Sequence, residues 1–284
     1  MAILEVAGAT LAYDASPGLW SGGDRPVLTF LHGFSHRGST WREMIDLLGP
    51  SISWVTVDLR GHGATTTEPG AAHTMDACAG DIASLWEHLG IGRTHRVGYS
   101  MGARLALHIA THRPGPMATL VVIAGSAGLA EPGRSERLRE DSDLAGRIEA
   151  EGIGWFADHW AALPMFAGLA ARGEATLSEL RRVRLGNRPE GLAASLRDMG
   201  QGAMVPLWDL LTNIRMPVLL IAGERDPRLE VTRTLHAAMP HSRLRLVPGA
   251  GHAVHLEAPG EVAMEIGRWV ESHQITTASA HSSE

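Results

Sequence analysis

The chain has 284 residues, of which 44% are hydrophobic and 20% charged, so it can bury a substantial core. Its formal net charge of −6 argues against a nucleic-acid partner, because binding to a phosphate backbone needs a basic surface. All 25 basic residues are arginine, and without lysine the chain can form no Schiff base, no covalent link to pyridoxal phosphate and no Walker-type phosphate site.

The first predicted elements along the chain are strands. Residues 2–13 alternate apolar and polar positions around Gly8, which predicts an N-terminal hairpin. The apolar runs that follow are mostly continuous, as in strands buried on both faces of a parallel sheet. They cover residues 27–31, 54–59, 96–99, 120–124, 218–222 and 244–247.

Helical patterns lie between these strands. Ile82, Leu85 and Leu89 share one helical face that stops at Gly90, and a similar spacing from residue 262 to 270 follows Pro259. The alternation of strand and helix predicts a doubly wound, mostly parallel α/β sheet.

The segment 129–206 differs, because strand runs disappear there and only helical, arginine-rich stretches remain. We expect it to be a helical cap inserted into a core of residues 1–128 and 207–274, with a separate helical domain as the alternative. Residues 275–284 are small and polar, which is typical of a flexible tail.

The sequence has no basic stretch followed by an apolar run at its N-terminus and no run of 18 apolar residues. Its single cysteine, Cys78, excludes an intramolecular disulfide, which fits a reducing compartment. We therefore expect a cytoplasmic protein without a membrane partner, and we interpret Cys78 as a small apolar filler on a helix.

A G-x-S-x-G motif, from Gly98 to Gly102, follows the strand at residues 96–99 and opens a helical segment at residues 103–110. The glycines allow a sharp turn that leaves the hydroxyl of Ser100 exposed above the sheet edge. This context predicts that Ser100 is a nucleophile.

A serine nucleophile needs a histidine to accept its proton and a carboxylate to orient that histidine. Asp226 follows the strand 218–222, and His252 lies on a glycine-rich loop after the next strand, so the order is serine, acid, histidine. Glu224 and His255 are the competitors for these roles. A metal site at His252, His255 and Glu257 is the alternative, but no further ligand lies nearby in the sequence, and we expect no metal.

Two backbone amides are predicted to form an oxyanion hole. The strand 27–31 runs into His32-Gly33-Phe34, which brings the amide of Phe34 near the serine turn if the two strands are neighbours. The amide of Met101, directly after the nucleophile, is the second predicted donor.

These motifs resemble the α/β-hydrolase superfamily over essentially the whole chain. The matching segments are residues 31–34, 58–63, 98–102, 223–226 and 251–252. The resemblance implies an eight-stranded, mostly parallel sheet with helices on both faces and an inserted helical cap. Epoxide hydrolases and haloalkane dehalogenases of this fold have aspartate where this chain has Ser100, so their chemistries are disfavoured.

Within the superfamily the chain is most similar to 2-succinyl-6-hydroxy-2,4-cyclohexadiene-1-carboxylate synthases of menaquinone biosynthesis. That family has tyrosine before its nucleophile and arginine four residues after it, matched here by Tyr99 and Arg104. By motif context, the resemblance also implies that Arg139, Trp160 and Arg184 bind a substrate with several carboxylates. The alternative is that Arg139 and Arg184 pair with acids on the cap surface.

This resemblance implies an elimination in which Ser100, activated by His252, removes a proton and pyruvate leaves, without an organic cofactor. A carboxylesterase that hydrolyses small esters through an acyl-enzyme is the first alternative. A ligand receptor that retains the triad is the second. The expected partner is a small carbonyl or carboxylate substrate, and the chain is expected to be a monomer or a weak homo-oligomer.

Overall fold

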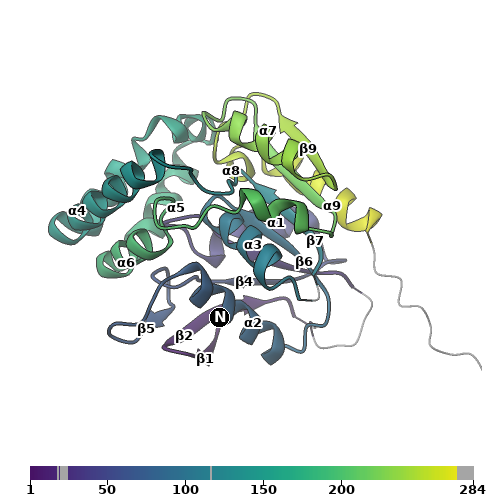
Figure 1. Ribbon diagram of the computed structural model, residues 1–284, viewed down its shortest axis with the longest axis horizontal. Coiled ribbons are helices and arrows are strands. Elements are labelled where there is room, and N and C mark those ends of the chain that lie inside the picture. The colour runs from purple at the N-terminus through teal and green to yellow at the C-terminus, as the bar shows by residue number, and fades with distance from the viewer. Residues whose placement is uncertain (18, 20–24, 116, 274–284) are drawn as a thin grey trace, which may run out of the picture.

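The computed structural model (Figure 1) describes residues 1–17, 19, 25–115 and 117–273. The predicted tail at 275–284 lies outside these residues. The strands are β1 (Ala2–Val6), β2 (Ala9–Ala15), β3 (Val27–Leu31), β4 (Ser53–Val57), β5 (Thr66–Thr67), β6 (Thr94–Tyr99), β7 (Met117–Ile123), β8 (Val218–Gly223) and β9 (Ser242–Val247).

All of these strands belong to one sheet. Eight strands follow the order β1-β2-β4-β3-β6-β7-β8-β9, and β5 pairs with β2 beside this path. The pairs β1/β2, β2/β4 and β2/β5 are antiparallel, whereas every pair from β4 to β9 is parallel. The predicted hairpin and the mostly parallel sheet are therefore confirmed, and the carboxyl ends of the parallel strands share one edge.

Helices cover both faces of the sheet (Figure 1), as predicted. The α-helices are α1 (Arg42–Leu48), α2 (Met75–His88), α3 (Met101–His112), α4 (Gly133–Ala161), α5 (Glu174–Leu185), α6 (Pro189–Met199), α7 (Leu229–Ala238), α8 (Val254–Glu257) and α9 (Pro259–Ser272). Three 3-10 helices accompany them, namely η1 (Gly38–Trp41), η2 (Pro164–Arg172) and η3 (Trp208–Asn213).

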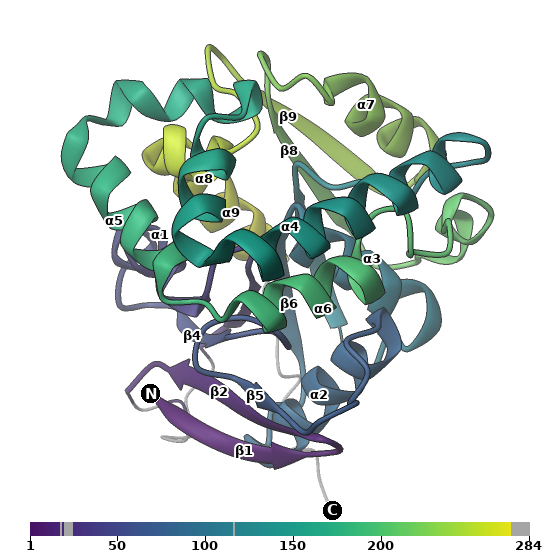
Figure 2. The same ribbon diagram turned by 90° about the vertical axis from the view of Figure 1, so that its left-hand side faces the viewer.

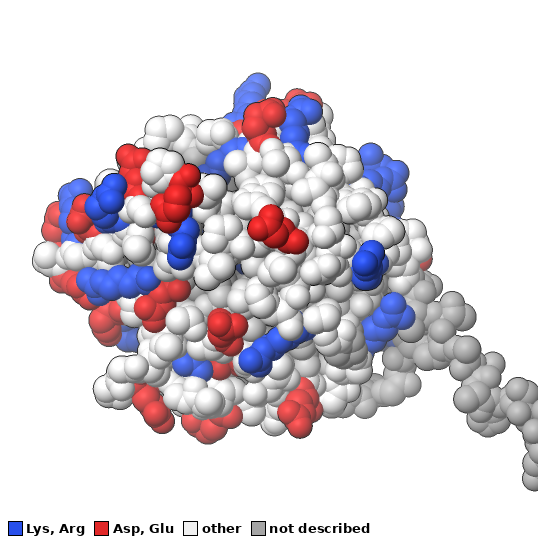
Figure 3. All heavy atoms as spheres, in the orientation of Figure 1, with Lys and Arg blue, Asp and Glu red and all other residues white. Residues whose placement is uncertain are grey.

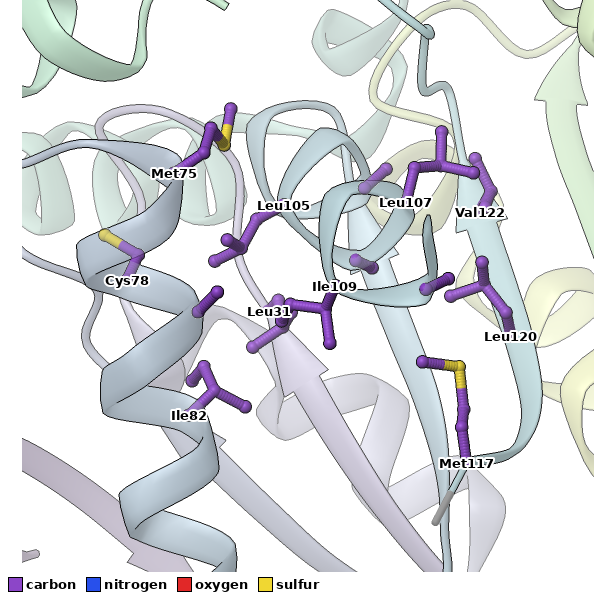
Figure 4. Close-up of a cluster of buried hydrophobic side chains, with 14 of the residues drawn as sticks. Leu31, Met75, Cys78, Ile82, Leu105, Leu107, Ile109, Met117, Leu120 and Val122 are labelled. Atoms are coloured by element: carbon purple, nitrogen blue, oxygen red, sulfur yellow. The ribbon is translucent and has the colours of Figure 1, made fainter. Parts of the chain in front are cut away.

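Two hydrophobic layers enclose the parallel strands. In β7, Leu120 and Val122 pack in the layer of α2 and α3, whereas Val121 and Ile123 pack in the layer of α1 and α9. Burial on both faces explains why the sequence runs are continuously apolar. Figure 4 shows the first layer, in which Cys78 lies on α2. Burial raises the pKa of the Cys78 thiol to about 12, in keeping with a small apolar filler.

The segment 129–206, which the structure describes throughout, holds four helical elements, α4, η2, α5 and α6, and no strand. In Figure 2, α4 and α6 run side by side in front of the sheet. The long helix α4 contains a kink at Gly152, where φ is 82°. We call these four elements the cap helices; the predicted division into a core domain and a cap stays a prediction.

Acidic and basic side chains intermingle on the outer face of the cap helices (Figure 3). Many are paired across or along helices, including Arg181 with Asp158 at 2.8 Å and Arg197 with Glu149 at 2.6 Å. Exposed pairs of this kind contribute little to stability. No helix of the described chain is both long enough and apolar enough to span a bilayer.

Candidate active site

Ser100 occupies the turn between β6 and α3 with φ 48° and ψ −104°, a backbone conformation that costs free energy for a residue with a side chain. The flanking glycines make the turn possible. A Cβ on Gly98 would lie 2.5 Å from the carbonyl oxygen of Gly102, and a Cβ on Gly102 would overlap the carbonyl oxygen of Leu31. The G-x-S-x-G motif therefore forms the strained strand-to-helix turn that the sequence predicts.

Three predicted residues meet at the carboxyl edge of the sheet. The Oγ of Ser100 lies 3.2 Å from Nε2 of His252, and Nδ1 of His252 lies 2.9 Å from Oδ2 of Asp226. A carboxylate can only accept, so Nδ1–H donates to Asp226 and leaves Nε2 to accept the serine proton. The second oxygen, Oδ1, accepts the amide of Arg228 at 2.9 Å.

The electrostatics keep Asp226 charged. Burial alone would raise its pKa, but the hydrogen bond to His252 and the charge of that histidine lower the pKa of Asp226 below its ordinary value. An ionised Asp226 can fix the tautomer of His252 and stabilise the imidazolium that forms when the serine proton is transferred.

The two competing residues lie elsewhere. Glu224 is exposed, and no hydrogen bond joins its side chain to either histidine in the described structure. His255 is buried with its ring 4.1 Å from that of Tyr99, and neither ring nitrogen has a hydrogen-bond partner among the described residues. Burial, followed by the charge of His252, lowers the pKa of His255 to about 3. The described residues contain no cluster of three potential metal ligands.

The predicted oxyanion donors lie on adjacent elements. Because β3 and β6 are parallel neighbours, the turn after β3 lies beside the turn that carries Ser100. Both Phe34 and Met101 line the same cavity as this serine. Met101 begins α3, so its amide has no partner within the helix. His32 braces the turn: Leu59 N–H donates to Nε2 at 3.0 Å, and Nδ1–H donates to the carbonyl of Gly33 at 2.8 Å.

A cavity of about 300 Å³ opens above Ser100 and His252. One part of its wall is cationic, with Arg104 from α3, Arg137 from α4 and Arg228 from the loop after β8. Glu140 and Asp141 of α4 also line it. The apolar part of the lining comes mainly from the cap: Leu144, Trp160, Leu163, Met165 and Phe166, together with Phe34.

Three of the predicted substrate-binding residues, Tyr99, Arg104 and Trp160, line this cavity. Burial, together with the charge of Asp226, raises the pKa of Tyr99 above its ordinary value, so the phenol stays neutral. Arg104 donates from Nη1 to the carbonyl of Met199 at 2.9 Å. Burial, followed by the charge of Arg137, lowers the pKa of Arg104 to about 9.

The prediction for Arg139 differs from the structure. Arg139 is exposed and is not among the lining residues, whereas Arg137 lines the cavity and donates to Asp141 at 2.7 Å. Two residues along a helix are separated by about 200° of rotation, so the two arginines point to opposite sides of α4. An acid four positions ahead does not distinguish the two in the sequence, because Asp141 stands at this spacing from Arg137 and Asp143 from Arg139.

Arg184 is also placed differently from the prediction. It is buried with an exposed fraction of 3%, yet it does not line the cavity; its guanidinium carbon lies 5.9 Å from the ring centre of Phe166. The alternative, in which Arg184 pairs with an acid on the cap surface, is not observed either, because Glu179 pairs with Arg182. No ion pair of Arg184 occurs among the residues that the structure describes.

Sequence reasoning missed Arg228, which lies two positions after Asp226 and is half-buried at the cavity wall. Burial, followed by the charge of Arg137, lowers the pKa of Arg228, and both side chains line the cavity. Its side chain makes no ion pair within the described part of the chain. The only signal in the sequence was its position on the loop of the predicted acid.

Comparison with known proteins supports this fold assignment. A sequence profile described as the Alpha/beta hydrolase family matches residues 30–265. The chain belongs to the alpha/beta hydrolase family. Among curated relatives, it is 34% identical over 232 residues to a Bacillus subtilis protein named as a 2-succinyl-6-hydroxy-2,4-cyclohexadiene-1-carboxylate synthase, a match that covers 81% of this chain and 84% of that protein. It is 30% identical to the synthase of that name from Serratia proteamaculans, over 86% of this chain and 92% of that one.

Solved structures give the same result. MenH from S. aureus aligns with a TM-score of 0.87 and 27% identity, covering 93% of this chain and 99% of that chain. A thermophilic esterase from Thermogutta terrifontis, solved with malate bound, aligns with a TM-score of 0.81 and 27% identity, over 94% and 95% of the two chains. Members of this alpha/beta hydrolase family with such similarity include both synthases and esterases.

Proposed function

We propose that this alpha/beta hydrolase is a lyase like 2-succinyl-6-hydroxy-2,4-cyclohexadiene-1-carboxylate synthase, which eliminates pyruvate from a substrate carrying several carboxylates. Ser100, His252 and Asp226 are its catalytic triad. The observation that carries the proposal is the cationic wall of the cavity above the serine, where Arg104 and Arg228 make no ion pair among the described residues.

The charge of this wall favours an anionic substrate. A partly buried guanidinium without an acid partner loses hydration free energy, and a bound carboxylate offsets that loss through two parallel hydrogen bonds. Arg137 is already paired with Asp141 and therefore adds less free charge. A neutral ester would leave Arg104 and Arg228 without a counter-charge, so the wall selects against it.

The chemistry follows from the triad geometry. His252 accepts the proton of Ser100 through Nε2, and the serine oxygen then removes the proton from the ring carbon that carries the succinyl group, next to its carbonyl. The electron pair left on that carbon forms a new ring double bond as the carbon–oxygen bond to the leaving group breaks. The departing pyruvate enolate takes up the proton that His252 holds, which returns the triad to its starting state. The amides of Phe34 and Met101 stabilise the oxyanion that develops on the carbonyl.

A carboxylesterase is the second candidate, and the apolar cap side of the cavity favours it. Trp160, Leu163 and Phe166 offer a surface that suits the acyl or alcohol part of a small ester. In that reaction Ser100 attacks the ester carbonyl, forms an acyl-enzyme and is released by a water molecule that His252 activates.

One experiment separates these functions. The purified chain is supplied, in parallel, with the pyruvate-bearing precursor of 2-succinyl-6-hydroxy-2,4-cyclohexadiene-1-carboxylate and with 4-nitrophenyl acetate, and pyruvate and nitrophenolate are measured. We expect pyruvate release with a kcat/KM well above that for the ester. Ester turnover without pyruvate identifies the esterase, and negligible turnover of both with tight binding of the precursor identifies a receptor.

A further inference from the structure

Glu257, the last residue of α8, reaches back to the loop that carries His252. Its Oε2 accepts the backbone N–H of Gly251 at 2.7 Å, and its Oε1 accepts the backbone N–H of Ala253 at 3.1 Å. These are the two amides on either side of His252. Both oxygens of one carboxylate therefore hold the backbone on which the imidazole is mounted, through charge-assisted hydrogen bonds.

The same carboxylate lies against the cap. A Cβ built on Gly168 of η2 would overlap Oε2 of Glu257, so only a glycine allows η2 to approach this closely. The elements α8 and η2 pack together. Two residues before Gly168, Phe166 lines the cavity with its ring 6.2 Å from the ring of His252.

From these contacts we infer that Glu257 is a positioning residue, which fixes the His252 loop and ties its place to that of η2. The inference rests on the triad assigned under the proposed function. It assigns Glu257 to two backbone amides rather than to the metal site considered from the sequence. Because proton transfer needs Nε2 within hydrogen-bond reach of the serine, a small displacement of this loop lowers reactivity strongly.

The test measures how fast Ser100 reacts with diisopropyl fluorophosphate, which needs an activated serine but not the natural substrate. The serine oxygen bonds to phosphorus, fluoride leaves and His252 takes the proton. In Glu257→Gln, an amide NH₂ faces one backbone N–H in place of an accepting oxygen. We expect the inactivation rate to fall about tenfold to hundredfold, the scale for losing a hydrogen bond to a charged group.

A second variant tests the link to the cap without changing the acid. In Gly168→Ala, the new methyl group displaces either the Glu257 carboxylate or η2, and we expect a comparable slowing of Ser100 modification. Gly146→Ala is the matched control, because a Cβ on Gly146 meets no other atom within 4 Å, and it should react like the wild type.

The outcomes are distinguishable. If the wild-type chain is not modified at Ser100, the triad assignment fails first, and the inference falls with it. If the wild type reacts but Glu257→Gln and Gly168→Ala react at its rate, the positioning role is wrong even when their urea midpoints are lowered, because that pattern shows a purely structural role. If only Gly168→Ala matches the wild type, the link between η2 and the His252 loop is wrong.

Discussion

The carboxyl edge of the sheet, which we call the rim and which carries Ser100, Asp226 and His252, contributes to the cavity in a different way from the cap helices. At the rim, each functional side chain is held by a local contact: Ser100 by a strained turn, Asp226 by a backbone amide and His252 by the carboxylate of Asp226. The cap contributes long side chains such as Arg137, whose direction depends on helix rotation.

This difference teaches where chemistry and selectivity reside. Strand ends in a parallel sheet converge by topology, so residues far apart in sequence are brought together with little freedom. Cap residues reach the cavity from α4, which is kinked at Gly152, and from η2, which follows α4 after a short link. On a helix, a shift of two residues turns a side chain to the opposite side. We therefore expect rim variants to abolish turnover and cap variants to change substrate preference.

The largest expected effect is at the rim. Ser100→Ala and His252→Ala should each reduce pyruvate release by about 10⁴- to 10⁶-fold, because triad residues act as a unit. The double variant should be no worse than the worse single variant. Steady-state assays with urea unfolding as the folding control check this, and single variants that keep most of the wild-type rate would exclude the triad.

The cationic wall gives the next largest effect. Arg104→Ala should raise the free energy of the transition state for the polyanionic substrate by about 2–5 kcal/mol, the scale for removing one partner of a buried charged pair. Hydrolysis of any neutral ester should change far less. Measured kcat/KM values for both reactions test this, and equal losses on the two substrates would show that Arg104 supports the fold rather than the substrate.

Buried histidines in the core should make the free energy of unfolding decrease at acidic pH. Burial lowers the pKa of His32 to about 4 and those of His62 and His255 to about 3, whereas unfolded histidine titrates near about 6.5. As the pH falls below about 6.5, the unfolded chain binds protons that the folded chain does not, so the free energy of unfolding decreases by about 1.4 kcal/mol per pH unit for each histidine.

Urea unfolding at about pH 7.5, 6 and 5 measures this slope. His255→Phe should remove one histidine's share of it, because neither ring nitrogen of His255 has a partner among the described residues. Stability that is independent of pH over this range would contradict neutral burial of these side chains.

The smallest expected effect distinguishes two neighbouring arginines on α4. Arg139→Ala should change kcat/KM by less than about 0.5 kcal/mol, the usual range for an exposed substitution. Arg137→Ala should have a clearly larger effect, because it removes a lining cation and leaves Asp141 without its partner. A larger loss of kcat/KM in Arg139→Ala than in Arg137→Ala would mean that α4 is rotated differently when substrate is bound.

The sequence predicted the rim far better than the cap. Continuous apolar runs and the glycines around Ser100 have few structural solutions, so the parallel strands, the serine turn and the His252–Asp226 contact could be predicted. The rotation of each cap helix about its axis depends on packing between helices, which short motifs do not encode. The motif therefore points to Arg139, whereas Arg137 lines the cavity. Arg228 and Glu257 act through local contacts with the triad loops, and no pattern in the sequence marks those contacts.

The most direct test of a serine site under an anion-selecting wall compares two substrates on the wild-type chain. The kcat/KM for pyruvate release is measured with the free carboxylate precursor and with the same compound carrying methyl esters on its carboxylates. We expect the free precursor to be favoured by at least about 30-fold, the lower end of the loss expected for one unpaired buried charge. Equal values for the two compounds would contradict the proposed function.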